Sequence, residues 1–219
     1  EGNTEIEGLL ESSDVLSTLN CLTSLGVDID KVFQRTLVKG QGLKGLKAPL
    51  TSLDCRNSGT TIRLLMGLLA GQSFSTQLTG DFSLCQRPMK RVIEPLRQMG
   101  ASIQPTGNGF APLTLKGQSL KGIDYELPIA SAQVKSALLL AGLYAEGITC
   151  LRGKLYSRDH TERLLPYFGG TLTRETDSIS IQGFQTLQGN SLKVPGDPSS
   201  AAFWQTAAGR HQQRQRQGQ

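Results

Sequence analysis

Three short polar motifs stand at the starts of apolar segments of this sequence, and each could bind an anion. Each offers a side chain that can cap a helix, small residues that let a ligand approach the backbone, and helix N–H groups without intrahelical partners. Helix N-termini carry positive partial charge, so three such ends that converged would form a phosphate or carboxylate site. The motifs are Asn57-Ser58-Gly59-Thr60, Ala130-Ser131-Ala132-Gln133 and Gly196-Asp197-Pro198-Ser199-Ser200.

Arginines complement these motifs, because a guanidinium group binds phosphate or carboxylate through paired N–H donors. The candidates are Arg63, Arg87 and Arg158. Taken alone, each motif is also explained as an ordinary helix cap, since Asn, Ser and Asp are preferred at helix starts. Recurrence at one position of a repeat favours a shared site and a small anionic substrate.

An internal repeat organises the chain. Three amphipathic segments lead into turn glycines at nearly equal spacing, Gly26, Gly100 and Gly169; the segments are SDVLSTLNCLTSLG, RPMKRVIEPLRQMG and SRDHTERLLPYFGG. This period predicts three copies of one supersecondary unit, each with an amphipathic outer helix. The apolar stripes of the first two outer helices are Val15, Leu16, Leu19, Leu22 and Leu25, and Met89, Val92, Ile93, Leu96 and Met99.

The pattern around these helices predicts the fold class. Hairpin strands are expected at 101–103 with 113–116 and at 171–173 with 178–181, and helices that are apolar all round are expected at 60–70, 133–145 and 198–208. We therefore predict an α/β protein with mixed sheets, built of about three β-α-β-α-β-β repeats around buried helices. The repeats fall roughly at 1–50, 51–122 and 123–194 of a single domain, 1–206, and the arrangement is not a doubly wound nucleotide-binding fold.

Composition narrows the class of protein. Hydrophobic residues make up 37%, and no apolar run is long enough for a membrane span. The four cysteines show no C-x-x-C spacing, which favours free thiols in a reduced, cytosol-like compartment over disulfides or zinc.

The net charge of +5 owes much to the tail at 207–219, which has the composition of a disordered or non-native segment. Aromatic residues make up only 5%, so a nucleic-acid-binding module is disfavoured. The abrupt sequence at both ends suggests a fragment.

Five strings, in order along the chain, carry a resemblance to a known family. They are NSGTTIRLLMGLLAG, GD-x4-QRPM, LPIASAQVKSALLLAGLYAEG, SRDHTERLL and VPGDPSSAAFW. Together they resemble motifs of the EPSP synthase (5-enolpyruvylshikimate-3-phosphate synthase) family over residues 1 to about 206. The resemblance implies one domain of the two-domain enolpyruvyl transferase fold, mainly the one that holds shikimate 3-phosphate. It implies transfer of an enolpyruvyl group from phosphoenolpyruvate to the 5-hydroxyl of that substrate, with loss of phosphate and without metal or cofactor.

The resemblance also assigns roles by motif. Residues implied on the phosphoenolpyruvate side are Asn57, Gly59, Thr60, Arg63, Arg87 and Gln133. Those implied for shikimate 3-phosphate are Ser131, Ala132, Gln133, Ser157 and Arg158. Asp197 is implied at the crossing between domains, and it is equally well placed to cap a helix that begins at Pro198. No catalytic acid or base is assigned within this chain.

Two alternatives remain beside that interpretation. The sister enzyme that acts on a UDP-amino sugar carries a cysteine five positions before its loop arginine, where this chain has Phe82, and Cys85 lies only two before Arg87. The other alternative is an inactive fragment that only binds shikimate 3-phosphate. The resemblance further implies a monomer in the cytoplasm, or in a plastid for a plant-like source, whose second domain is missing. It implies glyphosate sensitivity, because Gly59 lacks the methyl group found in some tolerant relatives.

Overall fold

A computed structural model of the chain describes residues 1–196 and 201–202. Asp197, most of the helix expected at 198–208 and the tail at 207–219 lie outside the described residues. None of the described helices combines the length and apolar character needed to span a membrane. The elements are β1 (Gly2–Glu7), α1 (Ser13–Ser24), β2 (Asp28–Val32), β3 (Arg35–Gly40), β4 (Leu53–Asp54), α2 (Gly59–Ala70), β5 (Ser75–Thr79), α3 (Phe82–Cys85), α4 (Lys90–Gln98), β6 (Ser102–Thr106), β7 (Phe110–Lys116), β8 (Leu120–Lys121), β9 (Asp124–Leu127), α5 (Ala132–Gly142), β10 (Ala145–Glu146), β11 (Ile148–Gly153), α6 (His160–Tyr167), β12 (Leu172–Arg174), β13 (Ser178–Gln182) and β14 (Ser191–Lys193).

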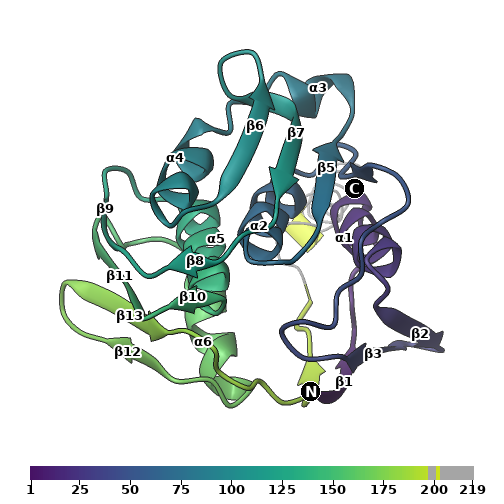
Figure 1. Ribbon diagram of the computed structural model, residues 1–219. Helices are drawn as coiled ribbons and strands as arrows, with labels where there is room; N and C mark the ends of the chain where they lie inside the picture. The colour runs from purple at the N-terminus through teal and green to yellow at the C-terminus, as the bar shows by residue number, and fades with distance from the viewer. Residues whose placement is uncertain (197–200, 203–219) are drawn as a thin grey trace, which may run out of the picture.

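Three four-stranded mixed sheets surround the interior helices (Figure 1), and they share one topology. Their strand orders are β4-β5-β7-β6, β9-β11-β13-β12 and β14-β1-β3-β2. In each, the first two strands are parallel and the other two continue antiparallel as a hairpin. The predicted α/β class with mixed sheets and hairpins is confirmed.

The third sheet joins the two ends of the described chain. Strand β14 pairs in parallel with β1, with Ile6 opposite Leu192. The predicted third repeat, 123–194, therefore contributes its last strand to the sheet of the first repeat. Period and spacing did not reveal this pairing, because a parallel contact between residues so far apart leaves no local pattern in the sequence.

Helices α2 and α5 form the interior. Both are apolar on most sides and pack directly on each other (Figure 1). Their approach is close because Gly67 has no side chain: a Cβ there would lie 2.1 Å from the carbonyl oxygen of Ala137. Two of the three predicted buried helices are thus confirmed. The expected end of the second, at residue 145, is wrong, since α5 stops at Gly142 and Ala145 belongs to β10, which pairs with β8.

The outer helices end as the glycine spacing predicts. Gly26, Gly100 and Gly169 have φ values of +85°, +100° and +82°, a backbone conformation that favours glycine. On α4 the predicted apolar stripe is buried in full.

The predicted stripe of α1 is only partly right. Its deeply buried helical residues are Ser17 and Cys21, whereas the predicted Val15 and Leu16 are half-buried and line a groove of about 460 Å³. Small polar side chains let α1 approach the interior closely. The hydroxyl oxygens of Thr18 and of Thr61 in α2 lie 2.7 Å apart. The Cys21 thiol donates to the Asp54 carbonyl at 3.5 Å.

Replacing Gly67 by alanine should destabilise the fold, because the new methyl group meets backbone rather than a mobile side chain. The expected loss in free energy of unfolding is about 1–3 kcal/mol, as for overpacked cores. Urea denaturation measures it. Gln98→Ala on the exposed side of α4 is the control, with a change within about 0.5 kcal/mol. Equal midpoints for the two variants would contradict the close packing of α2 on α5.

Candidate anion-binding site

The first turns of α2 and α5 lie together. Ser58 caps α2 by accepting a hydrogen bond from the Thr61 N–H at 3.2 Å, and Ser131 caps α5 by accepting from the Val134 N–H at 3.4 Å. The Gln133 side-chain amide donates to the Thr60 hydroxyl at 2.9 Å. Two of the three polar motifs are therefore brought to one place, as predicted. The third, with Asp197, falls outside the described residues except for its first residue, Gly196.

Arg63 lies across the start of α2 and is held by carbonyl groups. Its guanidinium donates to the carbonyl of Gly59 at 2.9 Å and to that of Pro88 at 3.2 Å. Burial lowers the pKa of Arg63, and the positive charges of Arg87 and Arg91 lower it further. Within the described residues Arg63 forms no ion pair, so its charge remains available to an anion.

Arg87 reaches the same place from the loop after α3. It donates to the Asn57 side-chain oxygen at 2.5 Å and to the Ser83 hydroxyl at 3.4 Å. Gly59 lies between the two arginines, because a Cβ built there would be 2.6 Å from Nη1 of Arg63 and 3.3 Å from Nη1 of Arg87. The absence of a side chain at Gly59 therefore leaves room for both guanidinium groups.

Asp81 holds Asn57 against the start of α3. Its carboxylate accepts from the Asn57 amide and from the Leu84 N–H, both at 2.8 Å, and so caps α3. These two hydrogen bonds, with a smaller contribution from Arg87, hold the pKa of Asp81 below its usual range. Motif and spacing did not assign a role to Asp81, although an aspartate directly before a short helix is a recognisable N-cap signal.

Ser157 and Arg158 lie on the loop between β11 and α6. The Ser157 hydroxyl donates to the Leu155 carbonyl at 3.5 Å, and its side chain is half-buried. Arg158 is exposed and, within the described part of the chain, has no hydrogen-bond or ion-pair partner. An exposed guanidinium without a partner can bind an anion without breaking an existing contact.

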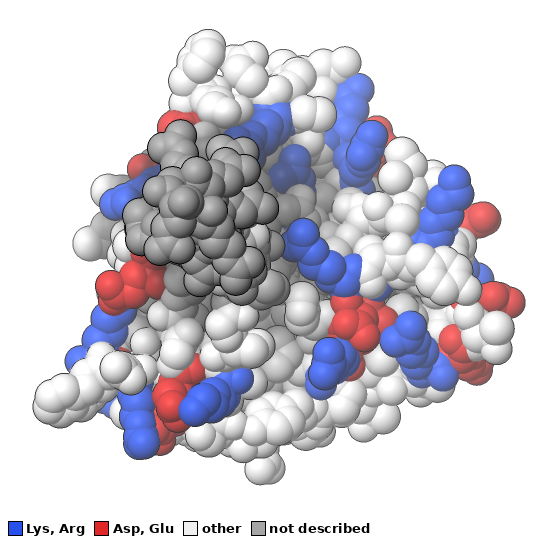
Figure 2. All heavy atoms as spheres, turned by 180° about the vertical axis from the view of Figure 1, so that it is seen from behind, with Lys and Arg blue, Asp and Glu red and all other residues white. Residues whose placement is uncertain are grey.

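The face opposite to the view of Figure 1 carries both signs of charge in its lower half and mainly positive charge near its upper hollow (Figure 2). Lys and Arg side chains gather around a hollow in its upper half (Figure 2). Such a hollow concentrates anions. Among the described residues, no group of three His, Cys, Asp or Glu side chains is placed to hold a metal ion.

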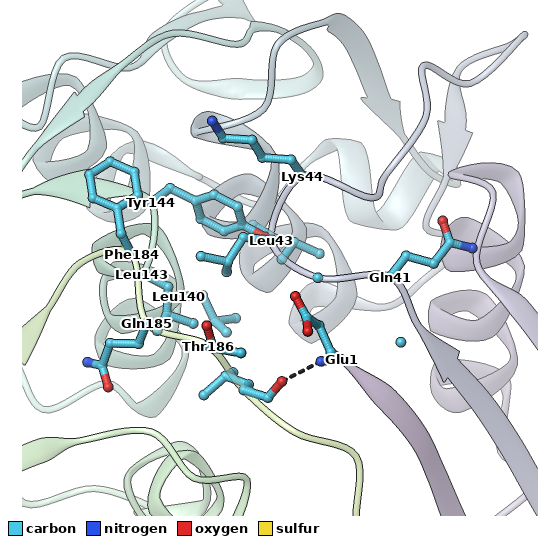
Figure 3. Close-up of a pocket in the computed structure, with 14 residues that line it drawn as sticks. Glu1, Gln41, Leu43, Lys44, Leu140, Leu143, Tyr144, Phe184, Gln185 and Thr186 are labelled. Carbon is cyan, nitrogen blue, oxygen red and sulfur yellow. Dashed lines mark hydrogen bonds between the residues drawn. The ribbon is translucent and has the colours of Figure 1, made fainter.

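A cavity of about 550 Å³ lies elsewhere, beside the C-terminal ends of the interior helices. Leu140, Leu143 and Tyr144 contribute to it from α5 and the following turn, with Leu43 and the chain's first residue across from them (Figure 3). Burial raises the pKa of Tyr144 to about 12, so this phenol stays neutral. None of the predicted site residues lines this cavity, whose walls combine leucine and aromatic side chains with polar ones such as Gln41 and Lys44.

Asp81 should make stability depend on pH. A carboxyl group whose pKa is lowered by folding stabilises the protein above its unfolded-state pKa, and this contribution disappears as the pH falls through the folded-state value. Asp81→Ala should therefore be less stable than the parent at neutral pH, with the difference shrinking in acid. Thermal unfolding between neutral and acidic pH measures this. Asp177→Ala, at an exposed position, is the control, and a pH-independent difference for Asp81→Ala would contradict the contacts described.

Known proteins are similar to this chain in both sequence and fold. A family model described as EPSP synthase (3-phosphoshikimate 1-carboxyvinyltransferase) matches residues 1–212. The 3-phosphoshikimate 1-carboxyvinyltransferase of Alkalilimnicola ehrlichii is 57% identical over 210 residues, which cover 95% of this chain and 47% of that protein. The corresponding protein of Bacillus pumilus is 52% identical over 207 residues, covering 94% and 48%.

A solved structure agrees with these relatives. EPSP synthase from Acinetobacter baumannii superposes with a TM-score of 0.89 at 49% identity, over 93% of this chain and 46% of that one. The chain thus spans about half the length of the curated relatives it matches. With a family model matched along nearly all of its residues and the same fold in a solved relative, the chain belongs to the EPSP synthase family.

Proposed function

We propose that this chain is the half of an enolpyruvyl transferase that mainly binds shikimate 3-phosphate. In the proposed reaction the 5-hydroxyl of shikimate 3-phosphate adds to C2 of phosphoenolpyruvate, and phosphate then leaves the tetrahedral intermediate. The observation that carries the proposal is the hydrogen bond from Gln133 to Thr60, which joins the starts of two interior helices and so brings the two implied substrate sides together.

Different residues of the site would bind the anionic groups of the two substrates. For phosphoenolpyruvate, Arg63 and Arg87 supply guanidinium groups on either side of Gly59. Asn57 accepts a hydrogen bond from Arg87, and Thr60 accepts one from Gln133. For the phosphate of shikimate 3-phosphate, Ser131 and the N–H groups from Ala132 onward offer a helix N-terminus, and Ser157 and Arg158 add side-chain donors.

The charge arrangement supports stabilisation of a transition state with developing negative charge. Arg63 and the two helix N-termini are positive, and carbonyl groups rather than carboxylates hold Arg63 in place. No described residue is given the role of acid or base. Proton transfer would come from the second domain. Together the two domains would act as one monomeric enzyme, in the cytoplasm or in a plastid.

The competing functions are less well supported. The UDP-amino sugar transferase is disfavoured by Phe82, which occupies the position where that enzyme carries a cysteine. An inactive fragment that only binds shikimate 3-phosphate is the second candidate, and it differs from the proposal in that adding the second domain would not restore turnover.

Titration with shikimate 3-phosphate tests the proposal. Isothermal titration of the chain should give saturable binding, and the double variant Ser131→Ala, Arg158→Ala should bind roughly a hundredfold more weakly, because two donors to the phosphate are lost. Phosphate release from added phosphoenolpyruvate is followed in parallel. Binding without turnover is expected of the chain by itself, and turnover would refute the assignment of proton transfer to the second domain.

The matched control is Ser12→Ala. Ser12 caps α1 as Ser131 caps α5, accepting from the Val15 N–H at 3.4 Å, but it belongs to none of the binding motifs. Its removal should leave the affinity for shikimate 3-phosphate within about twofold of the parent, since only a helix cap is lost. Equal loss of affinity in both variants would mean that the effect comes from helix capping and not from a phosphate contact.

Gly59→Ala should separate the two substrates. The added methyl group forces Arg63 and Arg87 to move, since it would lie 2.6 Å and 3.3 Å from their Nη1 atoms, while the shikimate 3-phosphate side is untouched. The affinity of the chain loaded with shikimate 3-phosphate for phosphoenolpyruvate and glyphosate should fall by about tenfold. Affinity for shikimate 3-phosphate itself should not change. The full-length enzyme, with Gly59, is expected to be glyphosate-sensitive. Glyphosate tolerance in a full-length reconstruction would argue against the placement of Gly59 beside the phosphoenolpyruvate groups.

A further inference from the structure

Two oppositely charged side chains are buried together between α5 and α6. The Lys135 ammonium and the Glu162 carboxylate form an ion pair, and their side chains are only 2% and 3% exposed. Lys135 follows Gln133 by two residues on α5, and Glu162 lies in the first turn of α6. The ion pair therefore connects the two segments that carry the groups proposed for shikimate 3-phosphate.

Lys135 also holds the loop between these segments. Its ammonium donates to the Leu155 carbonyl at 3.0 Å, and the Ser157 hydroxyl donates to the same oxygen at 3.5 Å. Leu155 stands at the start of the loop 154–159, and Glu162 comes just after its end. One ammonium group thus contacts both ends of the loop that carries Ser157 and Arg158.

We expect that the stability of the fold does not require a charged pair here. Burying two charges removes them from water, and well-packed apolar residues at such positions are often as stable or more stable. Glu162 has little further compensation: its second oxygen is 3.5 Å from Nη1 of the largely exposed Arg174, and neither oxygen accepts a well-aligned hydrogen bond from a described residue. An apolar pair could fill the space, but it could not donate a hydrogen bond to the Leu155 carbonyl.

We propose that Lys135, held by Glu162, is a positioning residue that sets the loop carrying Ser157 and Arg158 at the right distance from Ser131 and Gln133. This inference rests on the proposed function of the same site. It predicts that the ion pair matters more for affinity toward shikimate 3-phosphate than for folding.

The test is the double variant Lys135→Met, Glu162→Leu, which removes both charges and keeps the site filled. Its urea midpoint should stay near that of the parent, while its affinity for shikimate 3-phosphate falls by about tenfold or more. Hydrogen exchange of the amides in 154–159 should become faster. If this variant does not fold, Lys135→Gln with Glu162→Gln replaces it. The glutamine side chain is one atom shorter than lysine and should not reach Leu155, so the same loss of affinity is expected.

The control is Ser136→Ala. It removes the neighbouring contact between the same helices, in which the Thr161 hydroxyl donates to the Ser136 hydroxyl at 2.7 Å, without touching Leu155 or Glu162. Its affinity should remain near that of the parent. A folded ion-pair variant with unchanged affinity and unchanged exchange would overturn the inference. If the parent itself binds no shikimate 3-phosphate, the proposed function fails, and exchange in 154–159 alone then decides the role of Lys135.

Discussion

Because Gly67 of α2 lies against the backbone of α5 at Ala137, two helices from different repeats run close enough for their first turns to meet. The hydrogen bond from Gln133 to Thr60 is the polar end of that contact. The surrounding sheets, each with a parallel pair of strands and a hairpin, support the helices from outside. The separation of the two helix starts, and with it the spacing of the proposed substrate groups, follows from this packing.

The N-terminal and C-terminal ends of the interior helices differ in the polar groups and charges around them. Helices that are apolar on nearly all sides leave polar groups only at their termini. At the N-terminal ends, serine caps, free N–H groups and arginines concentrate positive charge. At the C-terminal ends, the neighbouring cavity has leucine and aromatic side chains in its walls beside polar ones. Carbonyl groups and Asp81 keep the positively charged end in place without cancelling all of its charge, which suits a site whose ligand is an anion.

The sequence predicted what local pattern can encode. The turns at Gly26 and Gly100, the stripe on α4 and the hairpins follow from periodicity and from backbone conformations that only glycine adopts easily. The pairing of β14 with β1 was not predicted, since it depends on contacts between distant residues. The buried face of α1 was predicted only in part, because Ser17 and Cys21 allow a closer approach than the larger apolar residues beside them.

Within the site, motif and resemblance named the groups that would face a ligand but not those that hold them. For this reason neither Asp81 nor Lys135 was predicted to belong to the site. A lysine within the otherwise apolar run of α5 was nevertheless a signal, because a buried ammonium requires a partner. The limits of the three repeats and of the domain stay predictions, as does the role of Asp197.

The most direct test of the central claim is an amide chemical-shift map of the chain titrated with shikimate 3-phosphate. If the starts of the interior helices form the substrate site, the largest shifts should fall on residues 131–133 and 157–158, with phosphoenolpyruvate added next shifting residues 57–63 and 87. Shifts confined to residues 140–144, beside the cavity near the C-terminal end of α5, would place the ligand at the wrong end of this helix and contradict the account.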